Sequence, residues 1–355
     1  MKKIGNCAKV RLQIYDISID MNTSGNATVA VLGAGSFGTV FAKILAENGH
    51  SVRLWNWAGD PGVLAEIEKN HTNKKYLPGV KLPKKIIPEG DLRKAVAGAE
   101  AVFFAVPSNV VARVADDASP FLEKNTIIVD ICKGLIPDSL ELVSACMVKR
   151  VDFARAKSIV AIAGPAIAKQ LATKKFTAMN IAGKSRANVE RVRALVENEY
   201  VRLIYCPDIV GLEIGGVGKN VYAIVLGLAD GVGLDLNAKA VLLTVAMKEI
   251  SNLVKAMGGK KETAYDLAGF GDLIGTAFSP DSRNRRFGEY LGKGIGKEKA
   301  LTKVGQVVEG VSATDCFIAL AEKQCVQVPL ARMTREAMVG NRGIKEIIME
   351  FLRKL

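Results

Sequence analysis

The sequence of 355 residues predicts an α/β fold, in which an N-terminal doubly wound parallel sheet is followed by an all-α C-terminal domain. Two observations support this prediction. Short apolar runs alternate with helical patterns as far as residue 206, and after Pro207 only long helical patterns remain. Repeated strand–helix units with continuously apolar strands are typical of a parallel sheet that helices cover on both faces.

The predicted strands are rich in β-branched and aromatic side chains. They lie at 29–32, 51–55, 101–106, 126–131, 158–163, 177–181 and 201–205, with helical patterns between several of them, as at 39–48 and 188–199. Further helices are predicted at 209–229, 237–257, 311–323 and 344–354. A chain of this length suits two domains. We therefore expect an extension over 1–26, a sheet domain over 27–206 and a helical domain over 207–355.

Composition and charge narrow the class of partner. The formal net charge is +13, but the basic residues are scattered rather than gathered in an arm, so we expect solvated charge and a basic pocket instead of a nucleic-acid surface. The apolar stretch 209–229 contains Glu213 and Lys219, which argues against a membrane span. Six scattered cysteines and two histidines suggest no metal site and no disulfide framework. Without a signal peptide at its start, the chain is expected in the cytoplasm.

A glycine motif directly follows the first predicted strand. It consists of Gly33, Gly35 and Gly38 in G-x-G-x-x-G spacing, and an apolar helix begins directly after it. The first glycine permits a tight turn, the second leaves room for a pyrophosphate, and the third allows close packing of helix and strand. This context predicts a Rossmann-type dinucleotide site.

The next strand decides between NAD and NADP in many such domains, because an acid at its tip binds the ribose 2′-hydroxyl. Here the strand ends in Trp55, Asn56 and Trp57, and the nearest acid is Asp60. Asn56 is a candidate for a ribose hydroxyl and Trp57 for stacking on adenine, whereas Trp55 suits ordinary packing. The sequence leaves both cofactors open.

Polar groups for chemistry follow the strands and continue into the helical region. Lys133 and the pairs at 107–108 and 164–165 come directly after predicted strands, whose carboxyl ends meet at one crevice. Lys219 lies in a helix among several glycines, where a desolvated ammonium would have a lowered pKa and act as an acid or base. Asp272 and Thr276 are spaced to share one helix face, and Arg283 has the planar fork that suits a phosphate.

These blocks, in this order, resemble the bacterial type of NAD(P)-dependent glycerol-3-phosphate dehydrogenase. The resemblance runs from about Thr28 to about Arg342. Its motifs are the glycine turn, Gly49-His50, Val106-Pro107-Ser108, Lys133-Gly134-Leu135, Gly164-Pro165, Gly218-Lys219-Asn220-Val221, Gly271-Asp272-Leu273, Ser282-Arg283-Asn284-Arg285 and Val307-Val308-Glu309-Gly310. The resemblance implies reduction of dihydroxyacetone phosphate to sn-glycerol 3-phosphate, a precursor of phospholipids, by a homodimer.

The resemblance and the motifs together assign the site residues. Lys219, Lys133 and Asp272 are expected to be catalytic, with Lys219 as proton donor and acceptor. The dinucleotide is assigned to Gly33, Gly35, Ser36, Phe37, Gly38, Trp57, Pro107, Lys133, Ala168, Arg283, Val307 and Glu309. The substrate is assigned to Lys133, Gly164, Ala166, Lys219, Asn220, Asp272, Thr276, Ser282, Arg283 and Asn284.

Three positions depart from the family pattern. Ala166 lacks a hydroxyl that would bond to substrate, a loss of about 0.5–1.5 kcal/mol of binding. Trp57 replaces a basic residue, which argues against a strong NADP preference, and Val245 stands where the family usually has Arg. Nothing in the sequence explains Val245.

Two alternatives of other kinds stay open at this point. One is a related hydroxyacid-type dehydrogenase with another substrate, against which Asp272 and the 282–284 block argue. The other is a non-catalytic dinucleotide-binding regulator, which Ala166 alone favours and the joint presence of Lys133, Lys219 and Asp272 disfavours.

Overall fold

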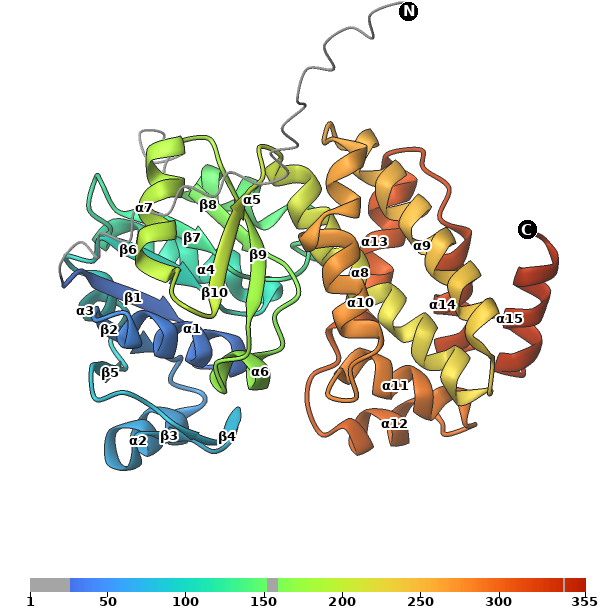
Figure 1. Cartoon of the computed structure of the whole chain (residues 1–355), viewed down its shortest axis with the longest axis horizontal. Coiled ribbons are helices and arrows are strands. Elements are labelled where there is room, and N and C mark those ends of the chain that lie inside the picture. The colour runs from blue at the N-terminus through green and yellow to red at the C-terminus, as the bar shows by residue number, and fades with distance from the viewer. Residues whose placement is uncertain (1–25, 152–158, 341) are drawn as a thin grey trace, which may run out of the picture.

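The computed structural model describes residues 26–151, 159–340 and 342–355. The N-terminal extension that we expected over 1–26 lies almost entirely outside the described residues, as does Ser158 at the start of one predicted strand. Within them, a sheet domain and a helical domain lie side by side, and helix α8 (Ile209–Gly231) runs along their junction (Figure 1). The predicted fold class is confirmed.

The sheet has eight strands in the order β10-β9-β8-β7-β6-β1-β2-β5. Their bounds are β1 (Thr28–Leu32), β2 (Ser51–Trp55), β5 (Ile86–Glu89), β6 (Ala101–Phe104), β7 (Ile127–Asp130), β8 (Ile159–Ala163), β9 (Thr177–Gly183) and β10 (Val201–Tyr205). Every neighbouring pair is parallel except β8 and β9, which are antiparallel. The sheet is thus dominated by parallel pairs, as predicted, but β9 and β10 run opposite to the rest.

Sequence patterns missed the edge strand β5 and a small antiparallel pair, β3 (Thr72–Asn73) with β4 (Leu77–Lys81). Strand β5 contains Pro88, and proline is accepted at a sheet edge because it has no N–H to donate. These segments are short and interrupted by proline or glycine, so they lack the uninterrupted apolar run that identified the other strands.

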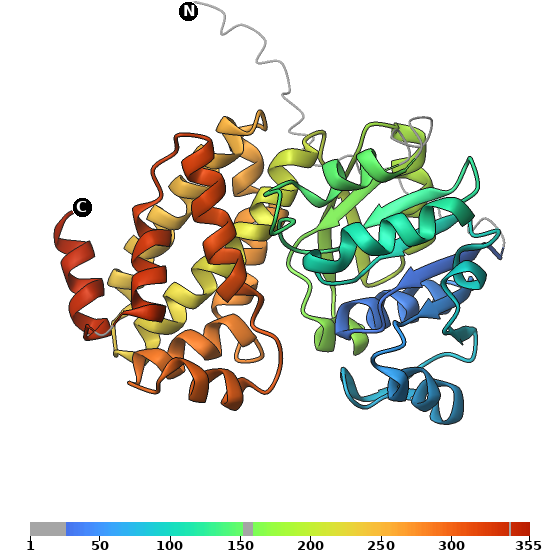
Figure 2. The same cartoon turned by 180° about the vertical axis from the view of Figure 1, so that it is seen from behind.

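Helices cover both faces of the sheet (Figures 1 and 2). Alternate residues of β1 point to opposite faces, so that Val29 and Val31 belong to one apolar cluster and Ala30 and Leu32 to another. The first cluster includes α1 (Ser36–Glu47) and α7 (Arg186–Val196), and the second includes α3 (Leu92–Val96), α4 (Ser108–Ala118) and α5 (Val143–Arg150). The sheet domain is completed by α2 (Pro61–Asn70), a 3₁₀ turn (Ser119–Phe121) and α6 (Ala168–Ala172).

The helical domain is built around α8, which is buried along nearly its whole length. Among the described residues it is the one helix long and apolar enough to cross a membrane, and 89% of its most apolar window is buried inside the protein. The surrounding elements are α9 (Leu236–Ala256), a 3₁₀ turn (Lys261–Tyr265), a π-turn (Leu267–Gly271), α10 (Asp272–Ala277), α11 (Arg283–Gly292), α12 (Lys297–Val304), α13 (Glu309–Lys323), α14 (Pro329–Val339) and α15 (Ile344–Arg353).

Helices α8 and α11 touch backbone to backbone through glycines. A Cβ atom added to Gly288 would overlap the carbonyl oxygen of Ile224, and one added to Gly227 would overlap that of Arg285. Further along, a Cβ on Gly292 would lie 2.6 Å from the carbonyl oxygen of Leu228. We call the close contact made by Gly227, Gly231, Gly288 and Gly292 the glycine seam.

We expect Gly288→Ala to lower the free energy of unfolding by about 1–3 kcal/mol, because the new methyl group meets backbone that cannot rotate away. Chemical denaturation followed by circular dichroism measures this loss. The control is Gly62→Ala in α2, where a Cβ meets nothing within 4 Å, so stability should stay the same or rise by up to about 1 kcal/mol. Equal stability of the two variants would contradict the seam.

Candidate active site

The glycine turn lies between the carboxyl ends of β1 and β6, where the strand order reverses. Gly33 has φ +113, and a Cβ there would lie 2.7 Å from the carbonyl oxygen of Ala105. A Cβ on Gly38 would overlap the carbonyl oxygen of Gly33, whereas one on Gly35 would meet nothing within 4 Å. Helix α1 begins right after Gly35 without a side-chain cap, so its first amides face that open space. The three predicted glycine functions match this geometry.

Two asparagines that sequence analysis did not assign to the turn hold it in shape. The Ala34 N–H donates to Asn56 Oδ1 at 3.3 Å, and Asn73 Nδ2 donates to the Ala34 carbonyl at 2.9 Å and to Thr39 Oγ1 at 2.8 Å. Asn56 Nδ2 also donates to the Asp60 carbonyl at 3.3 Å. The Asn56 amide, a candidate for a ribose hydroxyl from the sequence, is therefore already engaged with the backbone of Ala34 and Asp60. Asn73 lies in the short strand β3, which no sequence pattern predicts.

Lys219, Asp272 and Thr276 form a closed triangle of hydrogen bonds. Lys219 Nζ donates to Asp272 Oδ1 at 2.8 Å and to Thr276 Oγ1 at 3.2 Å, and Thr276 Oγ1 donates to Asp272 Oδ1 at 3.2 Å. Lys219 and Asp272 are only 5% and 2% exposed. The four-residue spacing of Asp272 and Thr276 thus gives the shared face predicted, and a surface-exposed lysine at position 219 is ruled out.

Burial lowers the pKa of Lys219 to about 8, and the positive charge of Lys133 acts in the same direction. The carboxylate of Asp272 opposes this shift and keeps the pKa from falling further. The amine can consequently gain and lose a proton near neutral pH.

Lys133, from the sheet domain, contacts the same carboxylate. Its Nζ lies 3.5 Å from Asp272 Oδ2 and 4.8 Å from the ring centroid of Phe37 in the glycine turn. Burial lowers the pKa of Lys133, but the charges of Asp272 and Glu309 and the hydrogen bonds to Lys219 and Asp272 together outweigh burial, and the pKa is raised. Lys133 therefore stays charged, and one carboxylate serves two amines of different character.

A second polar chain begins at Asn220, the residue after Lys219 on α8, and leads toward Arg283. Asn284 Nδ2 donates to Asn220 Oδ1 at 2.9 Å, and Asn220 Nδ2 donates to Glu309 Oε2 at 3.4 Å. The Arg283 guanidinium lies 3.6 Å from Glu309 Oε1 and donates to the Val307 carbonyl at 2.9 Å. The Arg283 side chain is 39% exposed, so it can still accept an anion. The polar chain that ends at Arg283, the candidate phosphate-binding residue, thus begins directly beside Lys219, the candidate proton donor, on the same helix.

The remaining predicted residues are distributed along this junction. Ser282 Oγ accepts from the Arg285 N–H at 3.2 Å and so caps α11, and Pro165 lies 3.4 Å from where a Cβ on Gly275 would stand. A Cβ on Gly164 would lie 2.8 Å from Met179 Cα. Other predicted residues begin or flank helices or face outward: Ser36, Pro107, Ala168, Trp57 (63% exposed) and Val307 (72% exposed). Ala166 packs into the core of the sheet domain.

Known proteins share both halves of this arrangement. Residues 28–189 match the family model for the N-terminus of NAD-dependent glycerol-3-phosphate dehydrogenase, and residues 208–349 match the model for its C-terminus. The chain belongs to the NAD-dependent glycerol-3-phosphate dehydrogenase family. Its α8 lysine and the glycine turn lie in the two separately matched halves.

Individual members of the glycerol-3-phosphate dehydrogenase family are similar over nearly their full length. The glycerol-3-phosphate dehydrogenase [NAD(P)+] of Bacillus velezensis is 37% identical over 327 residues, which cover 92% of this chain and 94% of the relative. That of Bacillus cytotoxicus is 36% identical and covers 90% and 93%. A crystal structure of glycerol-3-phosphate dehydrogenase from Coxiella burnetii has a TM-score of 0.87 at 32% identity, covering 92% of this chain and 99% of that one.

Behind Lys133 and Lys219 lies a buried acid cluster that the sequence did not reveal. Asp130 ends β7 and accepts the Cys132 N–H at 2.8 Å, while Glu213 of α8 accepts from the Ser144 N–H at 3.0 Å and from its hydroxyl. The two carboxyls also interact with each other. With Lys133 they line a cavity of about 10 Å³, the size for one water molecule.

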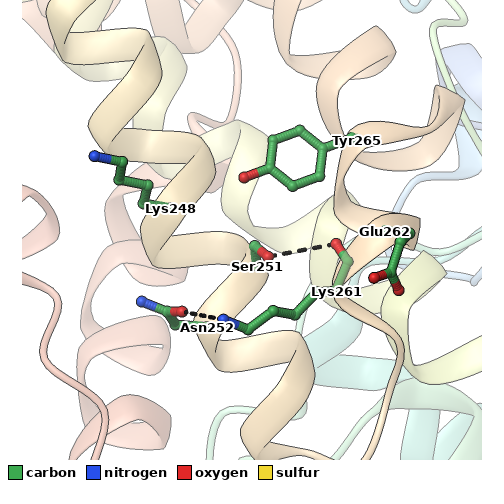
Figure 3. A pocket seen from close by; sticks show the side chains of 6 residues that line it. All are labelled: Lys248, Ser251, Asn252, Lys261, Glu262 and Tyr265. Carbon is green, nitrogen blue, oxygen red and sulfur yellow. Dashed lines mark hydrogen bonds between the residues drawn. The ribbon is translucent and has the colours of Figure 1, made fainter.

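A larger hollow of about 420 Å³ lies elsewhere on the surface, between α9 and the 3₁₀ turn (Figure 3). It is lined by Lys248, Ser251, Asn252, Lys261, Glu262 and Tyr265. None of these residues belongs to the polar chain from Lys133 to Arg283, so the hollow is separate from the dehydrogenase site.

The acid cluster predicts a pH dependence of stability. Burial raises the pKa of Glu213 from 4.5 to about 7, and burial with the nearby Glu213 charge raises that of Asp130. Between the ordinary carboxyl pKa of 4.5 and the raised value of about 7, the folded state therefore holds more protons than the unfolded state. The free energy of unfolding should fall as the pH rises through this range. Asp130→Asn keeps the acceptor for Cys132 but removes one titrating carboxyl, so its fall should be shallower.

Denaturation at several pH values between about 5 and 8 measures this slope. The buried Glu249, whose pKa burial also raises to about 7, contributes equally in wild type and variant. The control is Asp117→Asn, an exposed carboxylate paired with Arg113 across one helical turn, which should keep the wild-type slope. Parallel curves for wild type and Asp130→Asn would contradict the protonated pair.

Proposed function

We propose that this protein interconverts dihydroxyacetone phosphate and sn-glycerol 3-phosphate with NAD(P)H. The observation that carries the proposal is the buried Lys219–Asp272 pair. Lys133 contacts both Asp272 and Phe37 of the glycine turn. Asn220, next to Lys219 on α8, is linked through Glu309 to Arg283. A nucleotide turn, a proton-donating amine and a guanidinium in one connected site are what reduction of a phosphorylated ketone requires.

The residues present fit a dinucleotide. The open space over Gly35 and the amides at the start of α1 suit the pyrophosphate, because a side chain at position 35 would fill that space. Phe37, Trp57, Pro107, Ala168, Val307 and Glu309 are the further residues that we propose to line it. When bound, the nicotinamide supplies or accepts the hydride.

Lys219 is the group that we propose to move the proton. Its ammonium would donate to the carbonyl oxygen as negative charge develops there, and the neutral amine would accept the proton in the reverse direction. Asp272 and Thr276 fix the direction of the amine, and the permanent charge of Lys133 stabilises the developing alkoxide. Because the amine is buried, transfer of its proton to the developing alkoxide is favoured over a buried ammonium beside a full negative charge.

The far end of the substrate would be held by Arg283 and Asn284, with Ser282 beside them. The guanidinium offers paired donors that match phosphate oxygens. Gly164 and Ala166 would bring the loop after β8 to the substrate through backbone groups, because neither has a polar side chain. The Ala166 side chain packs into the core and has no hydroxyl, so only its backbone groups would reach the substrate.

The cellular setting follows from the same proposal. The product is the three-carbon backbone of glycerophospholipids, so a role in their synthesis would suit the activity. We propose a cytoplasmic homodimer, on the grounds that bacterial relatives are similar over 90% or more of this chain and that the apolar helix α8 is a core element. We also propose 27–206 as the dinucleotide domain and 207–355 as the substrate domain.

The test is a nicotinamide absorbance assay with dihydroxyacetone phosphate and either NADH or NADPH. Wild type should oxidise at least one of them, and Lys219→Ala should lower kcat by about 10²–10⁴-fold because the proton donor is lost. Lys248→Ala, in the separate surface hollow, serves as the control and should keep wild-type kcat. Absence of turnover with both cofactors would reject the proposed activity.

The pH profile gives an independent prediction. With a pKa of about 8, Lys219 is protonated below that value, so the rate of ketone reduction should be level below pH 8 and fall about tenfold per pH unit above it. Oxidation of glycerol 3-phosphate needs the neutral amine and should rise with pH up to the same value. Initial rates in both directions measure the two limbs, and limbs of the same sign would exclude Lys219 as the shared acid and base.

A further inference from the structure

Asn180 occupies a position where packing favours an apolar side chain. It lies in β9 with no exposed surface, and its neighbour two residues along, Ala182, belongs to a small apolar cluster with Ala163 and Ala268 at the junction of the domains. Burying an amide is unfavourable unless its hydrogen bonds are satisfied. The bonds that Asn180 makes therefore indicate what it contributes.

Two hydrogen bonds of the Asn180 amide cross from the sheet domain to the segment before Asp272. Its Nδ2 donates to Asp266 Oδ2 at 3.2 Å, and its Oδ1 accepts from the Ala268 N–H at 2.8 Å. Asp266 in turn accepts the Leu267 N–H at 2.7 Å. One amide thus holds both the cap and the first turn of the π-turn.

The π-turn determines where Asp272 points. The Gly271 N–H donates to the Asp266 carbonyl at 3.2 Å, five residues back, so this turn contains one residue more than an α-helical turn. An extra residue rotates everything after it by about 100° relative to a regular α-helix. Asp272 is the first residue of α10, directly after the turn.

The π-turn is also fixed against the helix that carries Lys219. A Cβ on Gly215 of α8 would lie 2.9 Å from Gly269 Cα, so the two backbones are in direct contact. This contact sets the distance between the turn and α8, and the Asn180 amide sets the shape of the turn. Together they determine the approach of Asp272 Oδ1 to Lys219 Nζ.

We propose that Asn180 is a positioning residue that, through Asp266 and Ala268, holds the π-turn in the form that aims Asp272 at Lys219. The expected effect on catalysis rests on the function proposed above, whereas the expected effect on the Lys219 amine does not. When the carboxylate is displaced, its support for the ammonium weakens while burial of the amine remains. The pKa of Lys219 should then fall below about 8.

The first measurement does not depend on turnover. Protein enriched with ¹³C at lysine Cε is titrated by NMR, and the Lys219 resonance is assigned by its absence in Lys219→Arg. Asn180→Leu, which keeps the volume but loses both bonds, should titrate at lower pH than wild type. The matched control is Asn198→Leu, which removes bonds to Asn48, Tyr200 and Val201 at the start of β10 and should leave the Lys219 titration in place.

The second measurement is steady-state kinetics with rescue. Asn180→Leu should lower kcat by about 10–100-fold and move the pH limb for reduction to lower pH, with little change in KM because Arg283 and Asn284 lie on another element. Asn180→Asp should also lower kcat and shift the pH limb, since it replaces the donor to Asp266 with a second carboxylate that repels it. Combining Asn180→Asp with Asp266→Asn restores a donor–acceptor pair in the opposite sense and should recover most of the activity.

The outcomes separate the two proposals. If wild type turns over no triose phosphate, the proposed function fails, and the NMR titration still decides whether Asn180 governs Lys219. An unchanged Lys219 titration in Asn180→Leu, even with lowered thermal stability, would show that Asn180 acts only in folding and would overturn the inference. A shifted titration together with rescue by the double variant would support it.

Discussion

The contact between Lys219 and Asp272 is the constraint around which this protein is organised. Each charge is almost completely removed from water, and loss of Asp272 would leave two amines without their shared carboxylate, at a cost of about 3–5 kcal/mol. The same burial lowers the pKa of the Lys219 amine to about 8. Stability and chemistry are therefore coupled at one atom pair, and neighbouring elements serve to keep its 2.8 Å distance.

Three parts of the chain must converge for that pair to be useful. The glycine turn and Lys133 come from the carboxyl ends of parallel strands, Lys219 from the middle of the central helix, and Asp272 from the end of a π-turn. Lys133 contacts both the turn through Phe37 and the helical domain through Asp272. The site thus belongs to the junction, and neither domain holds it alone.

Local sequence patterns were enough for the parts whose function depends on local geometry. The glycine turn, the buried lysine among glycines and the shared face of Asp272 and Thr276 follow from spacing along the chain. The asparagine that holds Ala34 is 39 residues away, and the Asn180–Asp266 bond spans 86 residues. A polar residue inside an apolar strand shows only that it needs a partner, and the partner depends on topology. The reversal of β9 and β10 escaped prediction for the same reason, because strand direction leaves no trace in composition.

The glycine seam has a consequence for the kind of molecule this crevice admits. At the glycine seam the backbones of α8 and α11 are in direct contact, so the spacing of the two helices there does not depend on core rotamers. Lys219 and Arg283 lie on these two helices. With the roles proposed for Lys219 and Arg283, this spacing would set the number of atoms between the reacting oxygen and the anionic end of the substrate. A substrate with more atoms between these two groups would have to bend, because there are no side chains at the glycine seam that could rearrange to move the helices apart.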